Sequence, residues 1–226
     1  NDNDIAISNE GIVVSVSNSD MFVYDESGMA LLDVGLDEFA DSLGLVANSY
    51  DPKVIYDPGE DRFILVFLNG SDASSTEIVV CFSATNNPSL GWNVYSLTGN
   101  PFNNNAWSDF PMISITNQDF FVSVNHINSD SVSWQTGFMQ SVIWQVQKSD
   151  GYAGNPITSI VHSDIDFQGK PIRNLLPVKG GFNLKDDEMY FISNRNFDIA
   201  NDTFFVLKIT ESLTQNSNPT TTVQVV

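Results

Sequence analysis

Basic residues are scarce in this sequence. The 226 residues include 9 Lys and Arg against 28 Asp and Glu, which gives a formal net charge of −19 at pH 7. Proteins that bind a phosphate backbone or an anionic lipid surface do so through clusters of Lys and Arg. We therefore expect neither nucleic-acid binding nor binding to anionic membranes. Because only 16% of the residues are charged, much of the polar surface has to come from neutral side chains such as Asn and Ser.

Cysteine is almost absent too, and long apolar runs are missing. Cys81 is the only cysteine, which excludes the small disulfide-stapled scaffolds of secreted proteins. No apolar run approaches the ~20 residues of a membrane-spanning helix, so no membrane insertion is predicted. The acidic start, Asn1-Asp2-Asn3-Asp4, is unlike the basic start of a signal peptide. For an exported protein we therefore expect that the signal peptide has been removed.

The sequence does contain a regular series of strand signals. Short apolar or alternating runs rich in Val, Ile, Phe and Tyr are separated by Asn, Asp and Gly clusters, which predicts an all-β fold. The runs fall into four groups of four: 5–8, 12–17, 21–25 and 29–34; 54–57, 63–68, 77–84 and 92–97; 112–116, 120–125, 142–148 and 158–162; 175–178, 189–194, 204–210 and 222–226. Helical spacing of apolar residues over 36–43, with Gly44 as a stop, predicts one short helix between the first two groups.

The second run of each group starts at Ile12, Phe63, Phe120 and Met189, at intervals of 51, 57 and 69 residues. Units of roughly 50 residues with four strands are typical of β-propeller blades. We therefore predict a β-propeller with four four-stranded blades, approximately 1–45, 46–100, 101–165 and 166–226, as a single domain or segment over 1–226. A β-sandwich or a β-helix is the competing interpretation, but a sandwich gives no reason for four similar quartets.

Four stretches resemble a group of secreted bacterial β-propeller proteins. They are NDIAISNEGIVVSVSNSDMFVYDESG, DPKVIYDPGEDRFILVFLNG, EIVVCFSATNNPSLGWNVYSLTG and WSDFPMISITNQDFFVSVN. In order, they are similar to an opening strand pair with a Y-D-K-S-G turn, a D-P-x-V-x-Y-D-x-x-x-D-R strand, an A-V-S-x-T-x-D-P-x-G-x-W strand turn and a W-A-D-Y-P strand start. The match covers Asn3 to Asn125, beyond which only the strand pattern continues.

The resemblance implies a fold and a cellular location. Many members belong to Bacteroidetes-type bacteria and carry a C-terminal sorting domain for type IX secretion, so the resemblance implies an exported or cell-surface protein. A structural role within a larger surface complex is the default expectation if neither glycan binding nor turnover is found. Members typically continue for further blades, which favours a segment of a longer propeller, with a closed four-bladed ring as the alternative. The resemblance implies no established activity, and no catalytic residue is carried over from it.

Three carboxylates stand near the predicted first strands of the first three blades: Asp4, Asp51 and Asp109. If the blades superimpose, these carboxylates gather at the mouth of the central channel. There they could cleave glycosides as general acid, base or nucleophile, or bind calcium, the one cofactor considered. Turn capping, in which Asp accepts hydrogen bonds from backbone N–H groups, is the simplest interpretation, because Pro52 and Pro111 mark turns nearby.

Long loops are predicted over 69–76, 99–108, 127–140 and 164–170, where a rigid β scaffold places recognition residues. Trp107 is the centre of the candidate ligand surface, because exposed tryptophan beside Asn and Asp can stack on and hydrogen-bond to sugar rings. The candidate ligand-binding residues are Asn103, Asn104, Asn105, Trp107, Asp109, His126 and Trp134. The alternatives are that Trp107 fills the gap between two blades and that His126 is a satisfied or exposed histidine.

These observations predict an extracellular or cell-surface binding or assembly module that recognises a glycan or a protein through its loops. The alternative is an enzyme, a glycoside hydrolase or lyase that uses the inner-strand carboxylates. A β-propeller hosts both kinds of function, so the fold alone does not decide between them.

Overall fold

Four four-stranded antiparallel sheets build the structure, a computed structural model that describes residues 3–45, 47–180, 183–184, 186–194 and 202–226. Sheet 1 comprises β1 (Asp4–Ile7), β2 (Val13–Ser17), β3 (Asp20–Tyr24) and β4 (Ala30–Gly35), and sheet 2 comprises β5 (Ser49–Asp57), β6 (Arg62–Asn69), β7 (Glu77–Ser83) and β8 (Trp92–Thr98). Sheet 3 comprises β9 (Ala106–Ile115), β10 (Asp119–Asn128), β11 (Phe138–Gln147) and β12 (Ser159–His162), and sheet 4 comprises β15 (Leu176–Pro177), β16 (Met189–Asn194), β17 (Phe204–Ile209) and β18 (Thr221–Val225). The sixteen predicted strands and their grouping are confirmed.

The burial pattern of the strands follows from where each sheet lies. In β2 and β3 every second residue is buried, because only one face of sheet 1 packs against a neighbour. In β6, β7 and β10 nearly every residue is buried, because sheets 2 and 3 are covered on both faces. Alternation therefore marks an outer sheet, and a continuous apolar run marks a sheet inside the stack.

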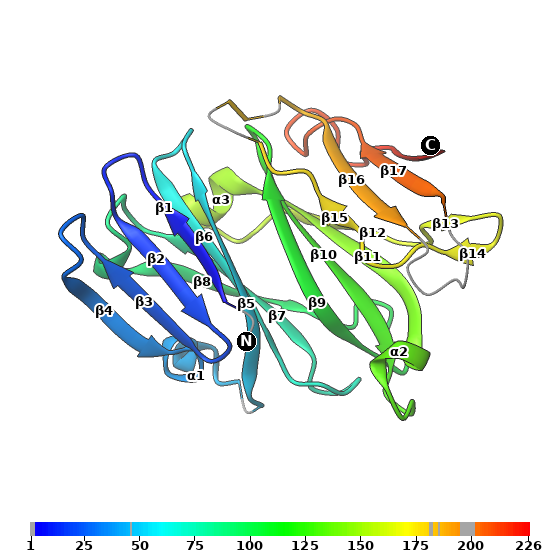
Figure 1. Ribbon diagram of the computed structural model, residues 1–226, viewed down its shortest axis with the longest axis horizontal. Helices are drawn as coiled ribbons and strands as arrows, with labels where there is room; N and C mark the ends of the chain where they lie inside the picture. Colours follow the sequence, from blue (N-terminus) through cyan, green and yellow to red (C-terminus); the bar gives the residue numbers. More distant parts are fainter. Residues whose placement is uncertain (1–2, 46, 181–182, 185, 195–201) are drawn as a thin grey trace.

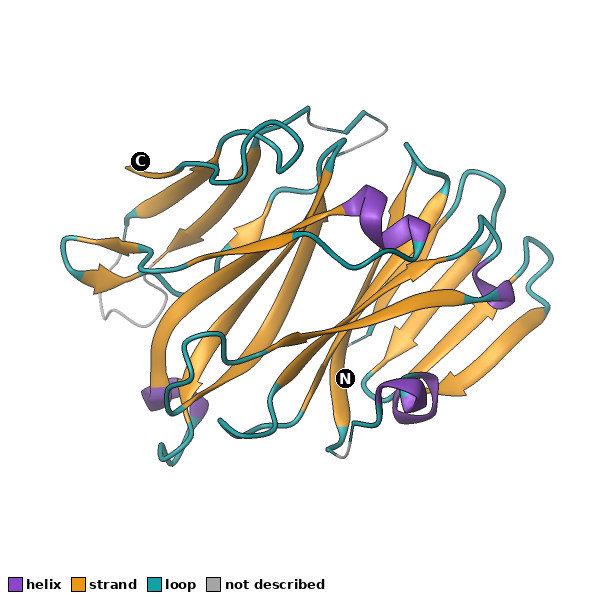
Figure 2. Cartoon of the chain, turned by 180° about the vertical axis from the view of Figure 1, so that it is seen from behind, coloured by secondary structure: helices purple, strands orange, loops and turns teal. Residues whose placement is uncertain are grey.

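The sheets follow one another like the blades of a propeller. Their first strands, β1, β5, β9 and β15, contact one another in chain order, and three hydrophobic clusters fill the spaces between sheets 1 and 2, 2 and 3, and 3 and 4. Sheets 1 and 4 lie at opposite ends of the molecule (Figures 1 and 2), and none of these clusters of described residues joins them. The four blades thus form an open fan, and the closed four-bladed ring considered from the sequence is not formed.

Helices are short. The predicted one is confirmed as α1 (Leu36–Phe39) followed by the 3-10 turn η1 (Asp41–Leu43), and Gly44 ends it with a φ of 65°. The elements that were not predicted are η2 (Pro88–Leu90), α2 (Trp134–Gly137), α3 (Lys148–Ala153) and a small hairpin of β13 (Asp166–Phe167) and β14 (Lys170–Pro171). The expected strand over 142–148 was wrong at its end, because Lys148 begins α3.

A buried ion pair joins sheet 2 to α3. The Lys148 ammonium lies 2.6 Å from Oδ2 of Asp57, and the Tyr152 hydroxyl donates to the same oxygen at 3.0 Å. Asp57 also accepts hydrogen bonds from the backbone N–H groups of Gly59 and Glu60. Asp57, at the end of β5, thus forms a structural contact between two blades.

Candidate functional site

The loops that precede the first strand of each sheet lie at one end of the fan. We call this end the loop face. Because neighbouring strands are antiparallel, the connection between the second and third strands of a sheet lies at the same end. The four long loops predicted to carry recognition therefore share one face. α1 and α2 lie at this end and α3 at the other (Figures 1 and 2).

The candidate residues do not all lie in loops. Trp107 and Asp109 belong to β9, His126 belongs to β10, and Trp134 begins α2. β9 and β10 run further toward the loop face than the sequence predicted, which shortens the two loops beside them. The longer strands hold Trp107 and Asp109 on a paired sheet, a more rigid support than the expected loop.

A bulge recurs near the start of β5 and β9. The pairing of β5 with β6 shifts after Tyr50, and the pairing of β9 with β10 shifts after Asp109. Each shift leaves two residues of the first strand opposite one residue of the second: Asp51-Pro52 in β5 and Phe110-Pro111 in β9. Asp51 and Phe110 both have a positive φ, 52° and 56°, a conformation that costs L-residues free energy. Asp109 therefore corresponds to Tyr50, one residue before the bulge, and not to Asp51.

Sheet 4 has a comparable feature before β15. Asn174 has a φ of 56°, and Arg173 stands directly before it. Tyr50, Asp109 and Arg173 thus occupy corresponding positions on three consecutive sheets; we call these three residues the axial row. Residues with a strained backbone cluster at functional sites in proteins. Each residue of the axial row stands directly before such a residue, Asp51, Phe110 or Asn174, which marks the axial row as a candidate site.

Asp109 is the electrostatic centre of the axial row. Burial raises the pKa of Asp109 to about 6, and the negative charge of Asp51 adds to the rise, while the Phe110 N–H and the Arg173 guanidinium oppose it. Burial also raises the pKa of Tyr50, and the charges of Asp109 and Asp51 add to that effect. The row thus holds a carboxyl group that takes up a proton near neutral pH beside a second carboxylate.

Arg173 is held by the chain around α2. Its guanidinium donates to the carbonyl of Trp134 at 3.0 Å and to that of Gln135 at 3.1 Å. The same group lies over the rings of Trp134 and Phe138, 5.2 Å and 4.9 Å from their centroids. Trp134 therefore covers the arginine, although 47% of its own surface is exposed.

A polar pocket of ≈ 760 Å³ opens on the loop face, where the loops of sheets 1 and 2 meet Trp107. Its two aromatic side chains are Tyr50 and Trp107. The other lining residues are Asn18, Ser19, Asp37, Ala47, Asn48, Ser49, Gly70, Ser71, Asp72 and Ser75. We call it the loop-face pocket. Most of its lining residues carry a hydroxyl, amide or carboxylate group, and none of them is basic.

Hydrogen bonds hold the wall of the loop-face pocket in place. The Tyr50 hydroxyl donates to the Gly70 carbonyl at 3.0 Å, and the Ser49 N–H donates to Oδ1 of Asp37 at 2.8 Å. Hydrogen bonds from Ser74 and Ser75 lower the pKa of Asp72 to about 2, so this carboxylate stays ionised. The pocket is therefore formed before any ligand arrives.

The three asparagines before β9 lie outside the loop-face pocket. Asn104 donates its N–H to Oδ1 of Asn100, and Nδ2 of Asn105 donates to Oδ2 of Asp130 at 2.7 Å. Asn103 is exposed and has a φ of 50°. Asn104 and Asn105 thus brace the loop, and the structure does not bring them together with Trp107 around one cavity.

His126 is fully buried, away from the loop surface. Its ring packs against Phe102 and Trp144, with centroid distances of 5.7 Å and 6.2 Å. Burial lowers the pKa of His126 to about 4, so the ring is neutral near pH 7. The structure therefore gives His126 a packing position.

Asp4 accepts hydrogen bonds from two backbone N–H groups. Its Oδ2 accepts from the N–H of Val54 in β5 at 3.1 Å, and its Oδ1 accepts from the N–H of Ile5 at 3.1 Å. This is the backbone capping that was one of the sequence-based interpretations. In the described part of the chain, no three His, Cys, Asp or Glu side chains gather closely enough to hold a metal ion. Calcium binding stays a prediction.

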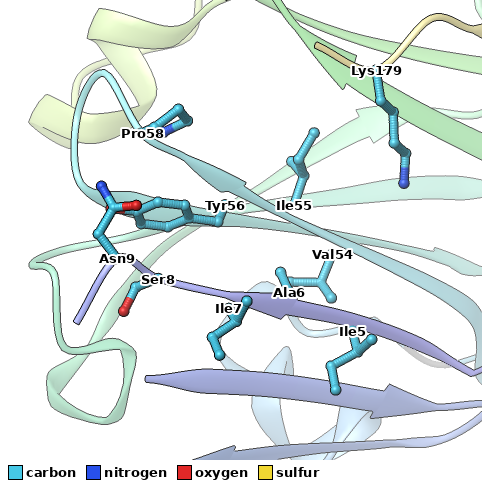
Figure 3. A pocket seen from close by; sticks show the side chains of 10 residues that line it. All are labelled: Ile5, Ala6, Ile7, Ser8, Asn9, Val54, Ile55, Tyr56, Pro58 and Lys179. Carbon is cyan, nitrogen blue, oxygen red and sulfur yellow. The ribbon is translucent and has the colours of Figure 1, made fainter. Parts of the chain in front are cut away.

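A second, apolar pocket of ≈ 520 Å³ lies along the first strands of sheets 1 and 2 (Figure 3). Its wall includes Ile5 and Ile7 from β1, Ile55 and Tyr56 from β5, and Lys179 from the loop after β15. It has few polar groups to orient a ligand, so we place the candidate site at the loop-face pocket and the axial row.

The sequence analysis missed Tyr50 and Arg173, although a signal for Tyr50 was present. Ser49-Tyr50-Asp51-Pro52 and Ser108-Asp109-Phe110-Pro111 share the spacing Ser-x-x-Pro, which aligns Tyr50 with Asp109. Arg173 carries no such signal, because the fourth sheet has no proline at the corresponding place.

No protein-family model matches the sequence, and no curated protein matches it. Among solved structures, a subtype N11 neuraminidase-like protein of A/flat-faced bat/Peru/033/2010 (H18N11) is similar with a TM-score of 0.52 and 10% identity, over 99% of this chain and 57% of that chain. A Synechocystis apocarotenoid oxygenase has a TM-score of 0.49 and 12% identity, over 98% and 47% of the two chains. The GH93 α-L-arabinofuranosidase of Fusarium graminearum has a TM-score of 0.43 and 11% identity, over 98% and 74%.

At this identity the similarity to the neuraminidase-like protein shows the fold alone, and the fold is that of a β-propeller. The present chain spans 57% and 47% of the length of the first two of these structures. No helix among the described residues is both long and apolar enough to cross a membrane.

Proposed function

We propose that this protein is a carbohydrate-binding module that holds a neutral, hydroxyl-rich glycan in the loop-face pocket. The observation that carries the proposal is the composition of the pocket wall. Tyr50 and Trp107 supply aromatic surface, and the rest of the wall supplies hydroxyl, amide and carboxylate groups. Aromatic rings stack on the C–H faces of sugars, and the polar groups exchange hydrogen bonds with sugar hydroxyls.

Charge selects among glycans. The pocket wall includes the carboxylates of Asp37 and Asp72 and no basic residue, and the whole chain has a net charge of −19. Sialylated or uronic-acid glycans carry the same sign and are repelled. Neutral hexose or pentose oligosaccharides are therefore the proposed ligands.

The test measures binding and compares a substitution inside the pocket with one outside it. Neutral oligosaccharides selected on a glycan array are titrated into the protein in a calorimeter. We expect Trp107→Ala to weaken binding at least about tenfold, because an aromatic hot-spot residue contributes about 2 kcal/mol or more and about 1.4 kcal/mol already corresponds to a factor of ten. Leu90→Ala, which truncates a 72% exposed side chain outside the pocket and the axial row, should leave the affinity unchanged. Binding that is insensitive to Trp107→Ala contradicts the proposed site.

A module of this kind fits an address outside the cell. The single cysteine is buried, and the chain resembles exported propeller proteins over Asn3 to Asn125. We therefore extend the proposal to a secreted or surface-displayed protein that presents its loop face to a glycan. If an array of neutral glycans gives no binder, recognition of a protein partner within a surface complex becomes the better hypothesis.

A second candidate function, glycoside hydrolysis, is supported by the pair Asp51 and Asp109. Hydrolysis of a glycoside needs one protonated and one ionised carboxyl group, and a pKa of about 6 lets Asp109 supply the proton. We expect Asp109→Asn and Asp51→Asn each to abolish turnover of a neutral polysaccharide panel while glycan binding persists. If binding occurs but the unchanged protein releases no product, the module is a binder only.

A further inference from the structure

Tyr50 belongs to both parts of the candidate site. It lines the loop-face pocket beside Trp107, and it is also the first residue of the axial row. Asp109, the second residue of the row, interacts electrostatically with both Tyr50 and Arg173. The loop-face pocket and the axial row therefore adjoin, and a ligand that fills the pocket reaches the row at Tyr50.

A second tryptophan, Trp134, stands at the other end of the axial row. It begins α2, which lies on the loop face (Figures 1 and 2), and 47% of it is exposed. Its ring covers Arg173, just before sheet 4, whereas Trp107 faces the loops of sheets 1 and 2. The two tryptophans therefore stand on opposite sides of sheet 3. Because packed sheets are about 10 Å apart, one sugar ring does not reach both.

The chain around Trp134 holds its ring in place. Ser133 caps α2, because its hydroxyl oxygen accepts a hydrogen bond from a backbone N–H of the helix at 3.4 Å. α2 packs tightly on β10, since a Cβ atom at Gly137 would come within 2.8 Å of the Ile127 side chain. Arg173 lies against the ring, 5.2 Å from its centroid. A ring that is already fixed binds a ligand with little loss of conformational freedom.

The axial row and the bulges beside it offer the same chemistry as the loop-face pocket. Phe110, in the bulge after Asp109, is 42% exposed and adds aromatic surface. Asp51 and Asp109 supply carboxyl oxygens that accept hydrogen bonds from sugar hydroxyls. Arg173 is only 8% exposed, so it presents little positive charge to a ligand. A neutral glycan therefore meets aromatic rings and hydrogen-bonding groups beyond the pocket as well as inside it.

We propose that the ligand is a chain of several neutral sugars that runs from the loop-face pocket across the axial row and stacks on Trp134. This inference rests on the proposed glycan binding and adds a second stacking platform to it. Trp107 holds one part of the glycan chain and Trp134 holds another. Once the first part is bound, the second part binds within the same complex, so a longer chain gains affinity without a second loss of translational freedom.

Calorimetric titration with a length series of one neutral glycan, from the disaccharide to the hexasaccharide, tests this inference. We expect the affinity to rise at least about tenfold along the series, as a second aromatic contact predicts. Trp134→Ala should remove the rise and leave the disaccharide affinity unchanged, whereas Trp107→Ala should weaken the binding of every member. If the affinity does not depend on length, the second platform is overturned while the loop-face pocket stands. If no member binds, the proposed function is overturned together with this inference.

Phe138 provides a matched control, because its ring also packs on Arg173. The guanidinium lies 4.9 Å from the Phe138 centroid, and Phe138 is less exposed than Trp134. Phe138→Leu disturbs the packing of Arg173 but leaves the exposed tryptophan, so we expect the rise of affinity with length to persist. If Phe138→Leu removes the rise as Trp134→Ala does, Trp134 acts only by positioning Arg173 and the stacking platform is overturned. A rise that survives Trp134→Ala overturns it equally.

Discussion

Asp109 gains its chemical character from its surroundings. An aspartate on a strand is ordinarily a solvated anion, but the bulge after Asp109 and the blades on either side bury its carboxyl group next to Asp51. Burial disfavours the charged form, and a neighbouring negative charge disfavours it further. The same side chain can therefore exchange a proton near neutral pH.

This pKa makes the stability of the protein depend on pH. The pKa of Asp109 is raised from 3.8 to about 6 in the folded chain, so the folded state binds the proton more tightly than the unfolded state does. That stabilisation is fully present below about pH 3.8 and is lost as the pH rises through about 6. Asp109→Asn keeps the side chain neutral and should gain stability relative to the unchanged protein between pH 4 and pH 7.

The expected gain in the free energy of unfolding is on the order of 1–2 kcal/mol, less than the full pKa shift implies because solvent still reaches the group. Urea unfolding of both proteins at pH 4 and pH 7 measures it. Glu10→Gln, which neutralises an exposed carboxylate, is the control. It should change the free energy of unfolding by the same amount at pH 4 and at pH 7. If the difference in the free energy of unfolding between Asp109→Asn and the unchanged protein does not grow from pH 4 to pH 7, the raised pKa of Asp109 is contradicted.

The sequence was enough to name Asp109, Asp51 and Trp107 as candidate site residues, but it did not predict which positions correspond between the blades. From the sequence, Asp4, Asp51 and Asp109 were expected together at the mouth of the central channel. In the structure, Asp4 accepts a hydrogen bond from the backbone N–H of Val54, and Asp109 corresponds in position to Tyr50. Register decides such relations, and a single bulge shifts it by one residue. Residue type is visible in a sequence, but the insertion of one residue into a strand is set by contacts with the partner strand.

At the scale of elements, strands were predictable and α3 was not. The strands have apolar runs bounded by Asn, Asp and Gly, so their pattern is local. α3 has the sequence Lys-Ser-Asp-Gly-Tyr-Ala, with no helical stripe and a glycine inside. A side chain at Gly151 would collide with the ring of Phe82 from sheet 2. The helix therefore exists because of tertiary contacts with sheet 2, which a local pattern does not contain.

The buried ion pair between Lys148 and Asp57 is one of these contacts. Both side chains are almost fully buried, 2% and 0% exposed. Lys148→Met leaves Asp57 as a buried charge without its cation, so we expect a loss of about 3–5 kcal/mol in the free energy of unfolding. Urea unfolding followed by circular dichroism measures the change.

Lys208 and Glu188 provide a matched control, because they form an ion pair with exposed side chains, 30% and 47%. Lys208→Met should cost less than about 1 kcal/mol. Equal losses for Lys148→Met and Lys208→Met contradict the view that burial makes the first pair important. In that case α3 would be held mainly by the apolar contacts of Tyr152 with Phe82.

At the scale of the whole molecule, the number of blades was predictable from the strand pattern, whereas the expectation of a segment instead of a closed ring came from the resemblance alone. Four quartets of strands are visible in the sequence because each blade repeats the same local pattern. Whether four blades meet in a ring depends on the angle between neighbouring sheets, which is set by how large side chains such as Phe82, Phe120 and Tyr152 interlock. That angle has no local signature, and the fan stays open.

The excess of negative charge also acts on the whole molecule. With a net charge of −19, the folded chain holds like charges closer together than the unfolded chain does, and this repulsion opposes folding. Salt screens it, since the Debye length falls from about 30 Å at 0.01 M to about 8 Å at 0.15 M. We expect the melting temperature at pH 7 to rise as NaCl increases over this range, by about 2–4 °C for each kcal/mol of repulsion removed. At pH 4.1, the isoelectric point of the sequence, the net charge vanishes and the same salt series should leave the melting temperature nearly constant. A rise of equal size at both pH values would mean that salt acts on apolar burial and not on the net charge.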